Sequence, residues 1–332
     1  MTVFVTGASG YLGRAVIGRL LERGERVRCL WRGDPADVPW GDRVEIARGD
    51  VTDAGALRRG LAGAEVVFHM AACVKTWARD RALFDRVNVE AVERLLEGAR
   101  AAGVRRVLYT SSFIALGPTD GRVADETTRH PGDRYRNDYE RTKALGLARA
   151  RAAAASGAPL VILIPGVIYG PGALTDGNHV AKIVRDFLRR RLPGVPGSGK
   201  RLWTYAYVDD VARGHLLARD RGLDGAAYAL GGEDADLNGV LALLEELTGV
   251  PAPKRHLPIA LVKALGAGEV AVARLTGRVP LLTPGVAEIY DHEWRISSET
   301  ARRALGYETT TLRDGLGRTV EWARRDLLGR RA

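Results

Sequence analysis

Tyr139 and Lys143 have the side chains and the spacing for acid–base chemistry. They are four residues apart in a stretch that we predict to be helical, which places them one turn apart on the same face. A tyrosine hydroxyl has an unperturbed pKa of about 10, so it needs nearby positive charge to exchange a proton near neutral pH. Lys143 would supply that charge, although a surface tyrosine–lysine pair without function would have the same spacing.

Ser112 adds a hydrogen-bond donor to this pair. It follows the predicted strand Arg106–Thr110, and the carboxyl ends of strands are where ligands bind in doubly wound folds. A serine there can donate to an oxygen that gains negative charge during a reaction, although serine is also an ordinary turn residue. Taken together with the glycine-rich segment that precedes them, we predict that Ser112, Tyr139 and Lys143 are catalytic.

The glycine-rich segment Gly7–Gly13 predicts a dinucleotide site. Its glycines have the spacing Gly-x-x-Gly-x-x-Gly and lie between a predicted strand and a predicted helix. Glycines in this context allow a tight turn, a close approach to a pyrophosphate and close packing of the helix. The helix N-terminus offers N–H groups to the phosphates. The alternative is that these glycines serve only the turn and its packing.

The end of the second predicted strand bears on the choice of cofactor. An acidic residue there would bind the ribose hydroxyls of NAD, whereas an arginine can pair with the 2′-phosphate of NADP. The sequence has Arg32, with Arg28 nearby, and the acidic Asp34 comes two residues later. We therefore favour NADP(H), while NAD(H) stays open because arginine is abundant throughout the chain. Asp50 follows the third strand, where it would either reach the adenine or serve as a turn residue.

Short apolar runs alternate with helical patterns over the first 170 residues, which is typical of a parallel sheet with crossover helices. The predicted strands are Val3–Thr6, Arg26–Trp31, Val44–Arg48, Val66–Met70, Arg106–Thr110 and Leu160–Ile164, and the predicted helices are 11–23, 54–62, 80–102 and 136–157. We predict an α/β, doubly wound Rossmann domain over residues 1–170. Residues 171–332 would form mainly a smaller C-terminal α/β substrate lobe, with about 203–230 returning to the first domain.

Composition narrows the class of protein. The 332 residues are 46% hydrophobic and carry a net charge of +10, but the arginines are scattered, so we expect no nucleic-acid partner. No apolar stretch is long enough to span a membrane, and we expect no membrane partner. The first strand starts at Thr2, which predicts no leader and a cytoplasmic protein. The two cysteines, Cys29 and Cys73, lack metal-ligand spacing, so we predict buried free thiols and no metal.

The chain resembles the extended short-chain dehydrogenase/reductase superfamily over its whole length. The resemblance rests on the glycine turn and on Gly49–Val51, His69–Ala72, Asn88-Val89, Ser111-Ser112, Tyr139–Lys143 and Pro165–Pro171. Within it, the chain is most similar to the dihydroflavonol-reductase-like branch, near proteins called farnesol dehydrogenases. That likeness is carried by Tyr109–Gly117, Thr204–Asp210 and Leu275–Leu282.

The resemblance implies roles for individual residues. It assigns catalysis to Ser112, Tyr139 and Lys143, and it has Asn88 brace the active site. Contacts to the cofactor would come from Gly7, Gly10, Tyr11, Leu12, Gly13, Arg32, Asp50, Val51, Ala71, Ala72, Asn88, Thr110, Tyr139, Lys143, Pro165 and Ile168. The expected enzyme is an NAD(P)-dependent dehydrogenase/reductase, and helices 80–102 and 136–157 would form a homodimer.

The expected substrate is small and uncharged or partly apolar. Many related sugar-nucleotide enzymes carry a phosphate-binding arginine where this chain has Trp203, although Trp203 would equally suit core packing. Positional candidates for substrate contacts are Lys75, Trp77, Phe113, Ile114, Asn178 and Trp203. Two alternatives stay open: a sugar-nucleotide epimerase or dehydratase with tightly bound NAD, and a non-catalytic, RNA-associated relative.

Overall fold

The computed structural model describes residues 1–329 and is built around one parallel sheet. The order of its seven strands is β10-β6-β5-β4-β1-β2-β3. The strands are β1 (Thr2–Thr6), β2 (Arg26–Trp31), β3 (Val44–Arg48), β4 (Val66–His69), β5 (Arg106–Thr110), β6 (Leu160–Pro165) and β10 (Ala227–Leu230). The strand order changes direction between β1 and β4, and ligands bind in the crevice beyond such a point.

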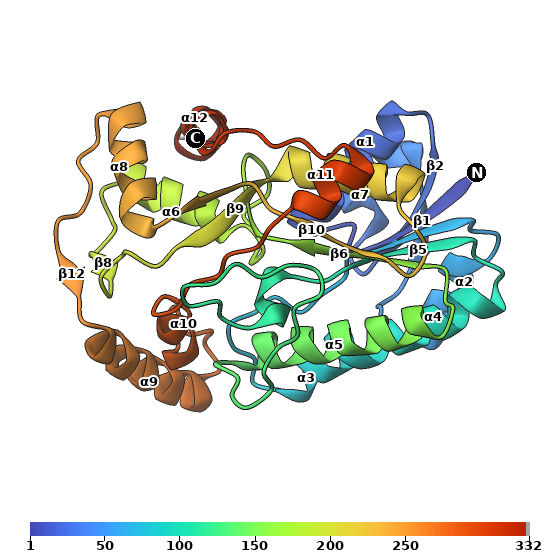
Figure 1. Ribbon diagram of the computed structural model, residues 1–332, viewed down its shortest axis with the longest axis horizontal. Helices are drawn as coiled ribbons and strands as arrows, with labels where there is room; N and C mark the ends of the chain where they lie inside the picture. The colour runs from blue at the N-terminus through green and yellow to red at the C-terminus, as the bar shows by residue number, and fades with distance from the viewer. Residues whose placement is uncertain (330–332) are drawn as a thin grey trace.

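Helices cover both faces of this sheet (Figure 1). One layer holds α1 (Tyr11–Glu22), α7 (Val208–Arg221) and α11 (Glu299–Leu305); the other holds α2 (Ala54–Leu61), α3 (Ala82–Asp85), α4 (Ala91–Ala101) and α5 (Asp138–Ala155). Alternate side chains of β1 enter the two layers, since Phe4 packs with α2 and Val5 packs with α1. Burial on both faces explains why the strands read as continuous apolar runs.

The predicted α/β Rossmann fold is confirmed, and six of its strands were visible in the sequence. The predicted helix 80–102 is divided into α3, a π-helical segment η3 (Arg86–Glu90) and α4. Of the segment 203–230, α7 and β10 lie on the seven-stranded sheet, whereas β9 (Trp203–Tyr207) belongs to a second sheet. Both cysteines are free and buried, and Cys73 lies in the loop after β4.

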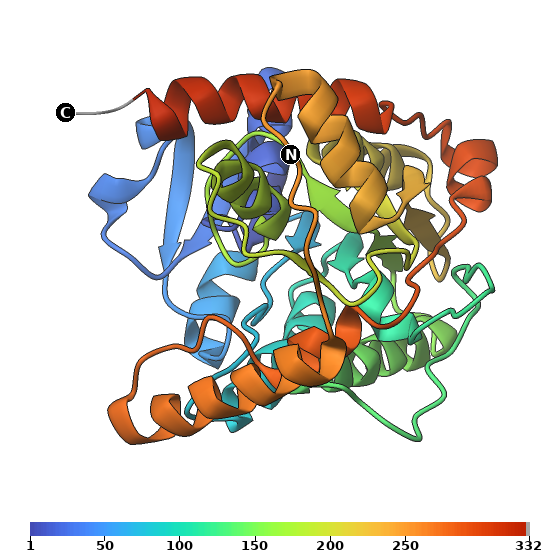
Figure 2. The same ribbon diagram turned by 90° about the vertical axis from the view of Figure 1, so that its left-hand side faces the viewer.

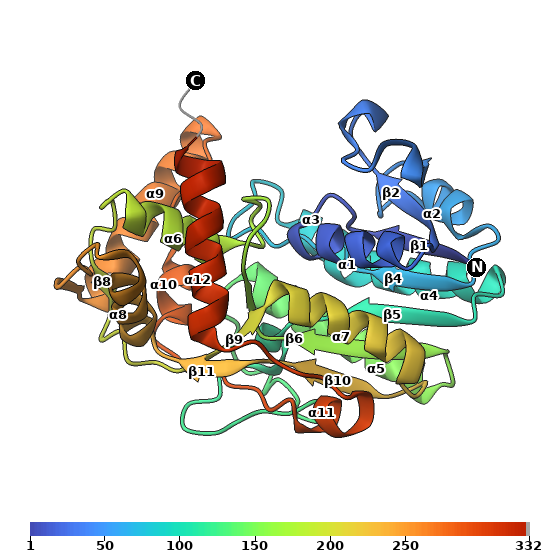
Figure 3. The ribbon, with the colours of Figure 1, turned by 90° about the horizontal axis from the view of Figure 1, so that it is seen from above.

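The remaining elements form a second group at the carboxyl ends of the strands, as Figure 3 shows. Its three-stranded sheet has the order β11-β9-β7, and β8 pairs with β12. The strands are β7 (Val167–Tyr169), β8 (Val195–Pro196), β9, β11 (Glu233–Ala235) and β12 (His256–Leu257). The helices are α6 (His179–Leu188), α8 (Leu237–Thr248), α9 (Ile259–Thr276), α10 (Pro284–Ile289) and α12 (Leu312–Trp322). Within residues 1–329, no helix combines the length and apolar character that crossing a membrane requires.

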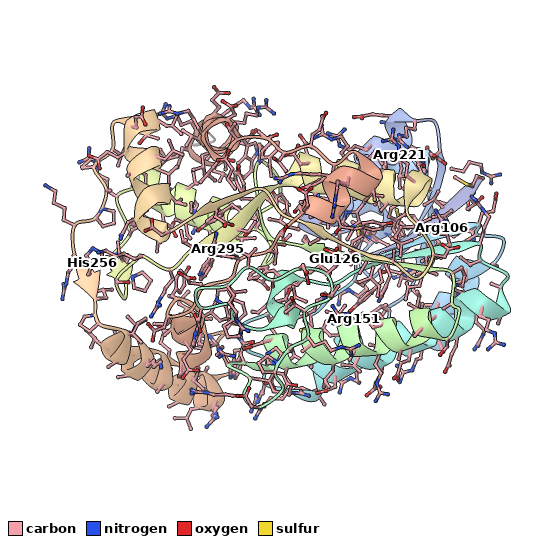
Figure 4. All side chains as sticks on the ribbon, in the orientation of Figure 1. Arg106, Glu126, Arg151, Arg221, His256 and Arg295 are labelled. Carbon is pink, nitrogen blue, oxygen red and sulfur yellow. The ribbon has the colours of Figure 1, made fainter. Side chains whose placement is uncertain are left out.

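Several of the arginines that give the chain its positive charge bind partners within the protein. The four arginines labelled in Figure 4 come from different parts of the chain. Arg106 and Arg295 form ion pairs with aspartates, while Arg151 and Arg221 donate to main-chain carbonyls. Arginine at these positions therefore has a structural use, and the absence of a nucleic-acid partner stays a prediction.

Candidate active site

The three glycines of the turn after β1 stand at positions that have no room for a side chain. Gly7 has φ of +76°, and a Cβ there would lie 2.6 Å from the main chain of Met70 and Ala71. At Gly10 a Cβ would lie 3.0 Å from the Gly7 carbonyl oxygen, and at Gly13 it would overlap that same oxygen. The turn, the loop after β4 and the start of α1 are therefore packed main chain against main chain.

The N-terminus of α1 is open to an anion. Its N-cap residue, Gly10, provides no side-chain cap, and the first turn carries no acidic residue. The first N–H groups of a helix have no partner inside it, and the helix dipole adds partial positive charge. An uncapped, glycine-lined helix start fits the diphosphate of a dinucleotide. Tyr11 would contribute only its main chain, because its ring packs against Gly170 and Gly172.

Arg32 and Asp50 lie together at the ends of β2 and β3. The Arg32 guanidinium is 3.3 Å from the Asp50 carboxylate and is 73% exposed. Partial burial acts to raise the pKa of Asp50, but hydrogen bonds from Thr52 and the charge of Arg32 lower that pKa overall. Arg28, the second arginine of this strand, is bound to Glu45 and to two carbonyls. Arg32 alone of the two is therefore available to a ligand.

Asn88 braces the loop after β4. Its two amide hydrogens donate to the Cys73 carbonyl (3.1 Å) and the Thr142 hydroxyl (2.9 Å), and its amide oxygen accepts from the Cys73 N–H (2.8 Å). Asn88 is buried, and both of its N–H groups have partners. These contacts are compatible with the predicted bracing role of Asn88, and its predicted contact with the cofactor stays a prediction. Ala71, in the same loop, donates its N–H to Thr6.

Ser112, Tyr139 and Lys143 meet beyond the carboxyl end of β5. Lys143 is buried and donates from Nζ to the Thr110 carbonyl at 3.0 Å. Burial lowers the pKa of Lys143 to about 7. Burial also raises the pKa of Tyr139 to about 12, and a hydrogen bond with the Ser112 hydroxyl acts in the opposite direction. The three residues predicted as catalytic are therefore brought together beyond the end of β5.

His215, on α7, supports this group and was not identified from the sequence. Its Nδ1 lies 2.8 Å from the Val211 carbonyl, so Nδ1 carries the proton and Nε2 accepts from the Thr110 hydroxyl at 2.9 Å. Burial lowers the pKa of His215 to about 4, which keeps the ring neutral. Thr110 is thus held from one side by His215 and from the other by Lys143.

A buried ion pair between Glu140 and Arg136 lies next to Tyr139 in the chain, and it was not identified from the sequence either. Glu140 is fully buried, and its carboxylate accepts from the Arg136 side chain (2.7 Å), the Arg136 N–H (2.7 Å) and His130 Nε2 (3.0 Å). The Arg136 guanidinium lies 5.9 Å from the centre of the Trp294 ring. This cluster ties the start of α5 to the second group of elements.

The predicted substrate contacts divide into two sets. Phe113 follows Ser112 and packs edge-on against Trp294, with ring centres 5.8 Å apart, and Ile114 is buried behind it. Lys75 is exposed and Trp77 is partly buried in the loop after β4. Phe113 and Ile114 therefore lie next to Ser112, whereas Lys75 and Trp77 stay positional candidates.

Trp203 and Asn178 have their polar atoms occupied within the protein. The buried Trp203 ring stacks on Tyr290 at 5.0 Å, and its N–H donates to the His292 carbonyl. Asn178 caps α6 and donates to the Gly170 carbonyl. Core packing, the alternative interpretation of Trp203, accounts for its contacts. Within residues 1–329, no group of three or more histidine, cysteine or acidic side chains is placed to hold a metal ion.

The chain matches a known family and several named relatives. The model of the NAD dependent epimerase/dehydratase family matches residues 3–231. A Synechocystis sp. protein provisionally named dihydroflavonol 4-reductase is 33% identical over 325 residues, which cover 96% of this chain and 93% of that protein. Sterol demethylase protein B of Methylococcus capsulatus is 35% identical over 334 residues, covering 98% of both chains.

Two solved structures share the whole architecture. The crystal structure of gox2253 has a TM-score of 0.82 and 30% identity, covering 98% of both chains. MoeE5 in complex with UDP-glucuronic acid and NAD has a TM-score of 0.77 and 27% identity, covering 98% of this chain and 99% of that one. The similarity therefore extends beyond the seven-stranded sheet to the second group of elements.

Proposed function

Because the chain belongs to the NAD dependent epimerase/dehydratase family, in the dihydroflavonol-reductase-like branch of the extended short-chain dehydrogenases/reductases, we propose that Ser112, Tyr139 and Lys143 catalyse its reaction. The reaction is hydride transfer between a nicotinamide cofactor and a hydroxyl or carbonyl carbon of a small substrate. The observation that carries this proposal is the meeting of these three side chains beyond β5, in the same sheet whose strand β1 leads into an uncapped, glycine-lined helix start.

The residues around the glycine turn would hold the cofactor. They are Gly7, Gly10, Gly13, the main chain of Tyr11 and Leu12, Arg32, Asp50, Val51, Ala71, Ala72, Thr110, Pro165 and Ile168, together with Tyr139 and Lys143. When bound, a nicotinamide dinucleotide would supply hydride for a reduction or accept it in an oxidation.

Tyr139 would handle the proton of the substrate oxygen. During a reduction its hydroxyl gives that proton to the oxygen of the carbonyl, and in an oxidation the phenolate takes the proton back. Ser112 donates a hydrogen bond to the same oxygen as its negative charge grows. Lys143, which a pKa of about 7 leaves partly protonated at neutral pH, would in its protonated form stabilise the phenolate that Tyr139 becomes. The raised pKa of Tyr139 keeps its proton in place at neutral pH, which is the form that a carbonyl reduction requires.

Arg32 supports NADP(H) as the preferred cofactor. Its side chain is mostly exposed, and its ion pair with Asp50 is long at 3.3 Å. A guanidinium in this position is free to turn toward a 2′-phosphate, which it would bind through paired hydrogen bonds.

The substrate that we propose is uncharged and at least partly apolar. Phe113, which follows Ser112 in the chain, packs against the Trp294 ring, and a relative of 35% identity is named for sterol demethylation. Trp203 packs in the core where a phosphate-binding arginine would stand in sugar-nucleotide enzymes. The second candidate is a sugar-nucleotide epimerase or dehydratase, which the similarity to MoeE5 favours.

A substrate panel tests the proposal. Alcohols, aldehydes and ketones, including long-chain and sterol-like ones, would be assayed with NADPH or NADP⁺ and with NADH or NAD⁺ by nicotinamide absorbance. We expect turnover of an apolar carbonyl or alcohol, faster with the phosphorylated cofactor. Protein that purifies with stoichiometric NAD and binds a UDP- or dTDP-sugar would contradict the proposal. The homodimer and the cytoplasmic location stay predictions.

A further inference from the structure

Helix α9 presents an apolar face that nothing in residues 1–329 covers. Leu261, Leu265, Val272 and Leu275 are 45%, 56%, 54% and 87% exposed, and their spacing of four, seven and three residues places them on one face. Val279 and Leu281, in the loop that follows, are 67% and 94% exposed. Six of the ten exposed large apolar side chains in the described residues therefore lie between positions 261 and 281.

The positions between these side chains are also apolar. The other exposed residues along the helix are mostly small: Ala260, Ala264, Ala267, Gly268 and Ala271. Only Val262, Gly266 and Ala273 of α9 are buried against the protein. Figures 1 and 2 show α9 at the edge of the molecule, with its long side turned outward. A continuous apolar face of this kind marks an interaction site and not an ordinary surface.

The charges that border this face are positive. Arg274 and Arg278 are exposed at its C-terminal end, and Lys254 and Arg255 are exposed before its N-terminal end. His256, labelled in Figure 4, lies beside the latter pair. The two acidic residues in the region are occupied. Glu269 accepts from the Leu281 and Leu282 N–H groups, and Glu288 pairs with Lys263 and Arg134.

The expectation of no membrane partner rested on the lack of a membrane-spanning segment, and the exposed face of α9 leads us to revise it. We propose that α9 and the loop Gly277–Leu281 form a docking surface for an anionic phospholipid bilayer. The helix would lie in the plane of the interface, with Leu265 and Leu275 among the acyl chains and Arg274 and Arg278 at the headgroups. Apolar side chains on one face and arginines at its border are the two features that such a surface requires.

A second copy of the chain fits this face less well than a bilayer does. A helix of 18 residues is about 27 Å long and about 10 Å wide. Two such helix faces would bury about 540 Å² in total, and stable protein interfaces bury about 1,200 Å² or more. Pairing two copies through this face would also concentrate the arginines of both, whereas anionic headgroups would complement them.

The docking surface is connected to the catalytic helix. Gly266 of α9 packs against Thr283 and Pro284, where an added Cβ would lie 2.8 Å and 2.9 Å from the main chain. Gly285, next along the chain, packs against Arg136 and Asn137 at the start of α5. A docked molecule would thus hold the Tyr139 end of α5 near the bilayer. This consequence rests on the proposed function, whereas the docking itself does not.

Vesicle sedimentation tests the docking surface without cofactor or substrate, so its outcome is independent of the proposed oxidoreductase activity. The full chain is mixed with vesicles of phosphatidylcholine alone or with phosphatidylglycerol added. We expect binding to the anionic vesicles and at least tenfold weaker binding to the neutral ones. The double variant Leu265→Glu/Leu275→Glu should bind anionic vesicles at least tenfold more weakly than the natural chain does.

Leu223→Glu is the matched control, because Leu223 is 71% exposed in the loop between α7 and β10. It should bind as the natural chain does, and unchanged thermal unfolding of all variants would show that they are folded. Failure of the natural chain to bind either vesicle, or equal binding by the double variant, would overturn the proposal. A dimer that the double variant splits, without vesicle binding, would assign the face to a second copy instead.

Discussion

The glycine turn and helix α9 both rely on small residues, but in opposite ways. At the turn, a Cβ on Gly7 or Gly13 would strike main-chain atoms, so the glycines let three segments touch. On α9, a Cβ on Gly268 would meet nothing within 4 Å. The turn uses small residues to bring main-chain N–H groups to a ligand, and α9 uses them to leave a smooth apolar face outside. Small residues thus indicate a site only when their surroundings are known.

Gly13→Ala is the sharpest test of this contrast. Its methyl group would overlap the Gly7 carbonyl oxygen, so the turn must open and lose its fit to a diphosphate. We expect the affinity for NADPH to fall at least a hundredfold, measured by calorimetry. Gly18→Ala in the same helix and Gly268→Ala on α9 both have open space, and they should bind NADPH normally. Equal NADPH affinity in all three variants would show that the tight packing at Gly13 is not needed for cofactor binding.

Substituting Glu140 and Glu269 in turn compares the stability contributed by a buried charge near the active site with that contributed by an acidic residue of α9. Glu140→Ala would leave the buried Arg136 without its carboxylate, which costs about 3–5 kcal/mol of unfolding free energy. Glu269→Ala would remove hydrogen bonds to two N–H groups of the following loop and should cost less than about 2 kcal/mol. Urea unfolding measures both values, and similar costs would show that the Glu140 cluster is not energetically special.

Lys143 should make stability depend on pH. Its pKa is about 7 in the folded chain and 10.5 as the ordinary value, so the unfolded chain binds more protons between these pH values. Stability from this group therefore rises as pH increases from about 7 to about 10.5, and is lowest below pH 7. Lys143→Met should be more stable than the natural chain below pH 7, with a difference that shrinks as pH rises.

Lys263→Met is the control for that measurement, because Lys263 lies on α9 and is 35% exposed in its pair with Glu288. It should not reproduce the pH dependence of Lys143→Met in urea unfolding at several pH values. A Lys143→Met variant whose stability follows the natural chain at every pH would show that Lys143 is not desolvated.

The smallest expected effect concerns the choice of cofactor. Arg32→Asp should lower the ratio of kcat/KM for NADPH to that for NADH by about tenfold, the value of one lost charged hydrogen bond. Arg274→Asp, an exposed arginine on α9, should leave the ratio unchanged. The same ratio in both variants would show that Arg32 points away from the 2′-phosphate.

Much of the fold was predictable because burial on both faces of a parallel sheet leaves continuous apolar runs. All six strands predicted in the first 165 residues exist, with ends that differ by one residue at most. The π-helical segment Arg86–Glu90 was not predictable, because its sequence is compatible with a regular helix. Strand β10, which was not predicted, is short, Ala227–Leu230, and it pairs with β6 although α6 and α7 lie between the two strands in the chain.

The active-site residues likewise fall into those that the sequence predicts and those that it does not. Tyr139 and Lys143 are one helical turn apart, so their spacing alone brings them together. His215 and Glu140 act through partners such as Thr110 and Arg136, and no local pattern distinguished these two from ordinary helix residues. Arg28 lies on the second predicted strand and Arg32 directly follows that strand, so the sequence did not decide which of them could bind a phosphate. The structure pairs Arg28 with Glu45 on the neighbouring strand, which the sequence does not indicate.

The central claim is that Tyr139 transfers the proton in a nicotinamide-dependent reaction. Tyr139→Phe removes only the hydroxyl, so the measurement is kcat with the best substrate of the panel together with the dissociation constant for NADPH. We predict that kcat falls at least a thousandfold, at the upper range of acid–base catalysis, while NADPH affinity stays within about twofold. Full activity in this variant, or loss of activity only through lost cofactor binding, would contradict the claim.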